Sequence, residues 1–205
     1  MLKDDNKKKL RGINVSVGYE WQEFYGDNSK LVGTDVRHDT FWKSLKGMFV
    51  PTCQGLKDKG VNVNFARLRS CQGRLVWPSI ENRIIKADVL IFDIAASQLK
   101  KMPFEGVVQF QKVIKTFNHN VLLEIGFALG QGKRVLLMCP NHLFNSIPSD
   151  LRGFHWTVYK GYFKDGEMIR NFADSCGAIA AFRSLMLDAW KEKNDTEANG
   201  GIQID

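Results

Sequence analysis

The segment from Asn118 to Pro140, "NHNVLLEIGFALGQGKRVLLMCP", joins an apolar helical run to an apolar strand-like run. Its first part predicts a helix from Val121 to Gln131, with Asn120 as the N-cap and Gly132 as the stop. Its second part, "KRVLLMCP", is a continuous apolar run that favours a parallel strand buried on both faces. A helix that leads directly into such a strand is typical of α/β proteins.

The same alternation extends in both directions along the chain. Apolar and β-branched runs predict four further strands, at residues 12–19, 61–68, 88–95 and 155–162. Helical spacing predicts helices over residues 40–60, interrupted at Pro51, over 79–87 with Ser79 as N-cap, and over 168–193. The polar segment 20–39 is expected to be a long loop. Five strands separated by helices favour a mostly parallel sheet with helices on both faces.

Length and composition indicate an ordinary globular protein. The chain has 205 residues, of which 44% are hydrophobic and 25% charged, which suits one domain. We expect a basic tail over residues 1–12, a single α/β domain over 13–192 and a polar tail over 193–205. No apolar stretch is long enough to span a membrane, and the N-terminus does not look like a signal peptide. A cytoplasmic location is therefore expected.

The formal net charge of +7 suits an anionic partner such as a nucleotide. No recognisable nucleic-acid-binding motif accompanies it, so we do not expect nucleic acid as the main partner. The four cysteines are scattered and form no C-x-x-C pair, and the histidines have no metal-ligand spacing. We therefore expect no bound metal and no disulfide framework.

Glu124 is the one charged residue inside the predicted apolar helix, between Leu123 and Ile125. In the first turn it would complement the helix dipole, an effect of about 0.3–1 kcal/mol. Such a residue usually lies on a wet face, however, and burial of a carboxylate is costly. A substrate pocket would account for that cost. The residues alone leave both readings open.

Asp93 ends the predicted strand "DVLIFDIA", and ligands of open α/β sheets bind at the carboxyl ends of the strands. An Asp at this position can also simply cap the next turn. If Asp93 and Glu124 share one pocket, they form a carboxylate pair of the kind that cleaves glycosidic bonds. One carboxylate would attack or stabilise the anomeric carbon, and the other would hold a sugar hydroxyl or pass a proton.

Further polar and aromatic residues lie near predicted strand ends or helix starts. Each has an ordinary structural alternative, such as core packing for Trp77 or a solvated strand end for the arginines. Lys133 is expected to cap the C-terminal end of the helix before it. The candidates for substrate binding are Gly18, Arg67, Arg69, Trp77, His119 and Asn120.

The strand ending in Asp93, followed by the pattern N-x-x-x-E-h-G-x-A-x-x-x-G-K-x-V, resembles the nucleoside 2-deoxyribosyltransferase family. It is also similar to TIR-like nucleotide-processing proteins. The pattern covers residues 87–140, about a quarter of the chain, and is matched by Asn120, Glu124, Gly126, Ala128, Gly132, Lys133 and Val135.

This resemblance implies a flavodoxin-like, doubly wound fold and a catalytic Glu124 that attacks C1′ of the sugar. It also implies that Asp93 contacts sugar or base, that no cofactor or metal is needed, and that the chain forms a homo-oligomer. Tyr19 is a loose match to the family tyrosine that orients the Glu. The chain departs from the family after its first strand, where "VSVGYEWQEF" replaces a small-residue turn.

Two functions follow as expectations. The first is an enzyme that cleaves or transfers the N-glycosidic bond of a nucleoside, nucleotide or NAD-like substrate through Glu124. The alternative is a non-catalytic nucleotide-binding sensor of the same fold, as in bacterial defence or signalling systems.

Overall fold

The computed structural model describes residues 11–19, 23–25, 31–34, 36–68, 76–95, 117–164, 167–172 and 175–198. The predicted site residue Arg69 and most of the long insert after β5 lie outside these ranges. The strands are β1 (Arg11–Gly18), β2 (Glu23–Tyr25), β3 (Leu31–Thr34), β4 (Val61–Arg67), β5 (Val89–Asp93), β6 (Arg134–Pro140), β7 (Trp156–Lys164) and β8 (Glu167–Asn171). The helices are α1 (Val36–Lys57), α2 (Val76–Lys86), α3 (His119–Gly130), the 3-10 helix η1 (Asn141–Ser146), α4 (Ser149–Arg152) and α5 (Cys176–Ala198).

A six-stranded sheet in the order β4-β1-β5-β6-β7-β8 forms the centre of the fold. Its first five strands are parallel, and β8 runs antiparallel to β7 at the edge. These five are the strands that the sequence predicts, so the mixed α/β class is confirmed. The expected total of five is wrong, because residues 167–171 form β8 rather than the start of a closing helix.

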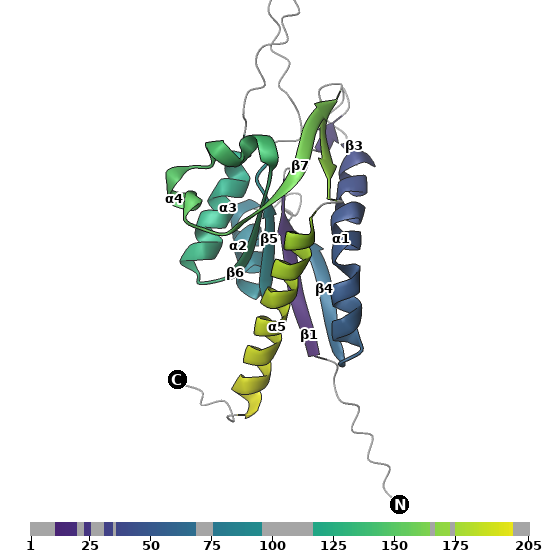
Figure 1. Ribbon diagram of the computed structural model, residues 1–205, viewed down its shortest axis with the longest axis vertical. Coiled ribbons are helices and arrows are strands. Elements are labelled where there is room, and N and C mark those ends of the chain that lie inside the picture. The colour runs from purple at the N-terminus through teal and green to yellow at the C-terminus, as the bar shows by residue number, and fades with distance from the viewer. Residues whose placement is uncertain are drawn as a thin grey trace, which may run out of the picture.

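Helices cover both faces of the sheet. Residues of α1 and α5 pack with the side chains of β1 that include Val15 and Val17. Residues of α2 and α3 pack on the opposite face, around Leu90 and Phe92 of β5. Figure 1 shows α1 and the α2–α3 pair on opposite sides of the sheet. Every residue of β5 is buried, which explains its continuous apolar sequence, since a central parallel strand is covered on both faces.

The start of α3 differs from the prediction by two residues. Asn118 is the N-cap, and its side chain accepts hydrogen bonds from the backbone N–H groups of Asn120 and Val121 at 3.0 and 3.2 Å. Asn120 is therefore inside the helix. The predicted stop is confirmed: α3 ends at Gly130, and Gly132 has a φ of 62°, which suits glycine.

Other predicted boundaries also change. Helix α1 continues through Pro51 without interruption, and α2 begins at Val76, so Ser79 is not its N-cap. The expected loop over residues 20–39 contains a two-stranded β2–β3 ladder and the first residues of α1. Helix α5 reaches Ala198, within the segment that the sequence predicts as a polar tail.

Candidate functional site

The carboxyl ends of β1 and β5 define the candidate site. These two strands are neighbours, and the chain continues from β1 to β4 on one side and from β5 to β6 on the other. Such a reversal of strand order opens a crevice at the carboxyl edge, where ligands of α/β proteins bind. Gly18 ends β1 and lies opposite Phe92, the residue before Asp93 at the end of β5.

Glu124 reaches this edge from α3. It is the sixth residue of the helix and only 7% exposed. A Cβ atom placed on Gly18 would lie 2.8 Å from Glu124 Oε2 and 2.4 and 2.6 Å from two ring atoms of Phe92. The carboxylate therefore lies directly against the backbone of Gly18. Because Glu124 is beyond the first turn, interaction with the helix dipole does not explain its position.

Burial changes the acidity of Glu124. Desolvation raises its pKa from the ordinary value of 4.5 to about 7, because burial disfavours the charged form. Within the part of the chain that the structure describes, no side chain or backbone group donates a hydrogen bond to this carboxylate. At neutral pH the group is present in both protonation states, which suits a residue that gives, accepts or shares a proton.

The close approach of Glu124 makes Gly18 sensitive to substitution. Gly18→Ala is expected to lower the free energy of unfolding by about 1–3 kcal/mol, because the methyl group would displace Phe92 or the carboxylate. Chemical denaturation measures this loss. Gly126→Ala is the matched control, since nothing lies within 4 Å of a Cβ atom at that exposed position. An equal loss in both variants would show that the approach is not tight.

Asp93 is held by a different set of groups. Its carboxylate accepts hydrogen bonds from the Tyr159 hydroxyl at 2.8 and 3.0 Å and from Arg170 Nε at 2.8 Å. It also accepts one from the backbone N–H of Ala95 at 3.2 Å. The Arg170 and Asp93 side chains are only 7% and 2% exposed, so the ion pair is buried. It ties the end of β5 to β7 and β8.

This buried group also affects neighbouring acidities. Burial and the Asp93 carboxylate raise the pKa of Tyr159 well above its usual range. Burial alone would lower the pKa of Arg170, but the charges and hydrogen bonds of Asp93 and Tyr159 together outweigh burial and raise that pKa. Tyr159 therefore remains protonated and Arg170 charged, so the contacts to Asp93 persist at neutral pH.

The two candidate carboxylates face opposite sides of the sheet. Phe92 packs with α2 and α3, and successive residues of a strand point to opposite faces. Asp93 accordingly points to the α1 and α5 side, where its partner Tyr159 is part of the core. Glu124 belongs to α3 on the other side, so the structure does not bring the two carboxylates together as the sequence hypothesis envisages.

The other predicted site residues are dispersed around the carboxyl edge. Tyr19 is buried in the core beside α1 and α5, on the side away from Glu124. The guanidinium of Arg67 lies 4.9 Å from the ring centroid of Trp42 of α1. His119 and Asn120 are exposed at the start of α3. Trp77 packs against Phe127, one helical turn after Glu124.

Sequence reasoning missed Tyr159 and Arg170. A buried Asp at a strand end calls for a cationic or hydrogen-bonding partner, and this was the one available signal. It does not identify the partner, because Arg170 lies 77 positions away on a strand that the sequence assigns to a helix.

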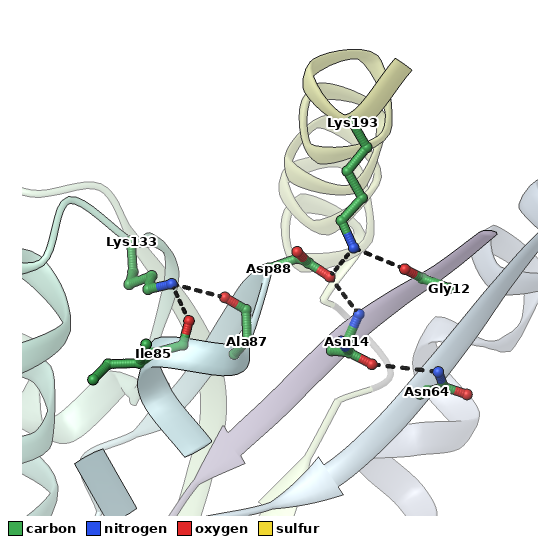
Figure 2. A network of polar contacts seen from close by, with 8 residues as sticks. All are labelled: Gly12, Asn14, Asn64, Ile85, Ala87, Asp88, Lys133 and Lys193. Atoms are coloured by element: carbon green, nitrogen blue, oxygen red, sulfur yellow. Dashed lines mark hydrogen bonds and ion pairs between the residues drawn. The ribbon is translucent and has the colours of Figure 1, made fainter. Parts of the chain in front are cut away.

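A concave region lies at the opposite, amino edge of the sheet. This cleft has a volume of about 670 Å³ and is lined by Gly12, Ala87, Asp88, Gln131, Gly132, Lys133, Arg134, Ala189, Glu192 and Lys193. Its charged groups make contacts within the protein, as Figure 2 shows for Asp88, Lys133 and Lys193. Arg134 forms an ion pair with Glu192.

The polar contacts of this cleft join secondary-structure elements. Lys193 of α5 donates hydrogen bonds to Asp88 and to the carbonyl oxygen of Gly12, each at 2.8 Å. Lys133 donates to the carbonyls of Ile85 and Ala87 at the end of α2, and not to the end of α3 as the sequence suggested. The contacts of Lys133 compensate the C-terminus of α2, and those of Lys193 anchor α5 to the sheet.

Other kinds of site find no support in the described ranges. Their His, Cys, Asp and Glu side chains form no group of three that could hold a metal ion. Burial raises the pKa of the Cys139 thiol to about 12, with a further contribution from Asp93, so this thiol is not an activated nucleophile. None of the helices described is long and apolar enough to cross a membrane.

Neither a comparison with protein-family models nor a comparison with curated proteins finds a match for this chain.

Proposed function

We propose that this protein is an enzyme that cleaves or transfers the N-glycosidic bond of a nucleoside, nucleotide or NAD-like substrate, with Glu124 as the reacting group. The observation that carries the proposal is the buried carboxyl of Glu124, which lies against Gly18 at the carboxyl end of β1. None of the described residues donates a hydrogen bond to it, and a buried carboxylate without such a donor destabilises a protein. Its presence at a ligand-binding edge is best explained by chemistry performed there.

Two further features support the proposal. The five parallel strands have the order β4-β1-β5-β6-β7, which is the second-first-third-fourth-fifth order of flavodoxin-like folds. We therefore assign the domain to that doubly wound type. The pattern that runs from Asn120 to Val135 resembles the nucleoside 2-deoxyribosyltransferase family, in which the Glu is catalytic.

Both protonation states of Glu124 suit glycosidic chemistry. The ionised form can attack C1′ as a nucleophile or stabilise an oxocarbenium-like centre, while the C1′–N bond breaks and its electron pair leaves with the base. The protonated form can deliver its proton to that nitrogen. Since the contacts of Asp93 are made within the protein, Asp93 supports the site by fixing the end of β5.

A sensor that binds a nucleotide without cleaving it is the second candidate function. The observation in its favour is the same raised pKa, because a protonated Glu124 could donate a hydrogen bond to a bound ligand. Among the described residues, no second carboxylate lies beside Glu124 to complete the pair that glycosidic cleavage commonly uses. This also favours binding without cleavage.

A chromatographic screen distinguishes the two functions. The full chain would be incubated with deoxynucleosides, ribonucleosides, their 5′-phosphates and NAD, with and without a second free base. The enzyme predicts that a free base or an exchanged nucleoside appears with wild type and is lost with Glu124→Gln. Retention of an intact nucleotide on both proteins, with no product from either, would favour the sensor.

A further inference from the structure

An aromatic pair lies on the same side of the sheet as Glu124. Trp77 of α2 and Phe127 of α3 meet edge to face, with ring centroids 5.6 Å apart and an angle of 77° between the ring planes. Both side chains are only partly buried, and both pack against the core beneath α2 and α3. Each ring is therefore held by packing against the core and still exposes part of its aromatic surface.

Helix geometry places Phe127, one member of this pair, next to Glu124. Phe127 follows Glu124 by three residues, and residues at this spacing are neighbours on one helix face. A helical side chain leans over the turn that precedes its own Cα atom, so Phe127 leans towards Glu124. Phe92 contacts the same site from the sheet below.

The described surroundings of Glu124 include the ring of Phe92 and no charged group that shifts its pKa. Within the described ranges, burial alone raises that pKa. Arg67, a cation at the same edge of the sheet, lies over Trp42 on the opposite side. A ligand part that fits here has an uncharged, planar surface and one atom that can exchange a hydrogen bond with a carboxyl group.

We infer that Trp77 and Phe127 form an aromatic wall against which a planar heteroaromatic base packs beside Glu124. This inference rests on the proposed function and deepens it, because it assigns the base rather than the sugar or a phosphate to the α2–α3 side. Bases stack well on aromatic rings, and loss of one such ring typically weakens binding about 5- to 150-fold. Trp77 is thus a base-binding residue of the site.

The test is equilibrium dialysis of the full chain carrying Glu124→Gln, so that no bond is cleaved. The probes are 2′-deoxyadenosine, thymidine and 2-deoxyribose. Adding Trp77→Leu is expected to weaken the binding of both nucleosides about tenfold or more. Trp77→Phe should retain most of the affinity, and 2-deoxyribose should bind weakly to every variant.

The matched control is Trp190→Leu. Trp190 of α5 is also partly buried and lies 5.9 Å from Lys59 Nζ, on the other side of the sheet. This change should leave nucleoside affinity unaltered. If Trp77→Leu fails to fold, tryptophan fluorescence replaces it: 2′-deoxyadenosine should quench the emission of the parent protein but not that of the Trp77→Phe variant.

Equal affinity with and without Trp77 would overturn the inference, as would equal affinity for nucleoside and free sugar, or no nucleoside binding at all. The proposed function fails differently. Trp77-dependent nucleoside binding, with no product from wild type, would contradict the enzyme and leave the aromatic wall intact. Product from wild type, with nucleoside binding that does not depend on Trp77, would support the enzyme and contradict the aromatic wall.

Discussion

Asp93→Asn is expected to lower the free energy of unfolding by about 3–5 kcal/mol. The substitution removes the negative charge that pairs with Arg170, whose side chain is only 7% exposed. The buried guanidinium keeps its contact with the Ala95 carbonyl oxygen and its desolvation cost, but it loses the attraction of the carboxylate charge. The Tyr159 hydroxyl also loses one of the two charged oxygens to which it donates. Denaturant titration at neutral pH measures the loss.

The amino edge supplies a matched control for this prediction. Asp88 also accepts a hydrogen bond from a cation, Lys193, but that pair is partly exposed. Asp88→Asn should therefore cost about 1 kcal/mol or less. In a double-mutant cycle, Asp93→Asn should cost much less in a protein that already carries Arg170→Met. A cost that is unchanged by Arg170→Met would contradict the coupling.

Glu124→Gln is expected to stabilise the protein in a pH-dependent way. The folded-state pKa of about 7 lies above the ordinary value of 4.5, so between these values the unfolded chain releases a proton that the folded chain retains. The stability of wild type therefore falls as the pH rises through this window, by about 3 kcal/mol in total. Gln does not titrate, so the variant avoids this fall.

The difference between variant and wild type should be constant below pH 4.5 and should grow by about 3 kcal/mol between there and pH 8. Thermal or chemical unfolding across this range measures it. Glu192→Gln is the control: its side chain is 61% exposed beside Arg134, and the change should alter stability by less than about 1 kcal/mol at every pH. A Glu124→Gln difference that stays flat with pH would show that the carboxyl is hydrated or paired.

The sequence predicts the parallel part of the fold well because its signals are local. Runs of apolar, aromatic and β-branched residues mark the five parallel strands, and the continuous apolar run of β5 reflects burial on both faces. Strand β8 was missed because "MIRNF" is short and adjoins a true helix. The cap of α3 was misplaced because Asn118 and Asn120 are both suitable N-cap residues.

The site was predictable in part for similar reasons. Glu124 stands out because a lone carboxylate in an apolar helix is costly without a purpose. Asp93 and Glu124 are separated because the Asp93 side chain points to the α1 and α5 side of the sheet, whereas Glu124 belongs to α3 on the other side. The sequence does not reveal these directions, because a long insert lies between the two residues. The partner of Asp93 comes from β8, so it could not be inferred without the tertiary fold.

The central claim is that the Glu124 carboxyl performs glycosidic chemistry, and the most direct measurement is the rate of base release by matched proteins. With a nucleoside, nucleotide or NAD substrate that wild type cleaves, Glu124→Gln should be at least about 100-fold slower, while Glu192→Gln should match wild type. Because Glu124→Gln is expected to be more stable than wild type at neutral pH, unfolding of the variant would not explain the slower release. Equal rates of base release from Glu124→Gln and wild type would contradict the claim.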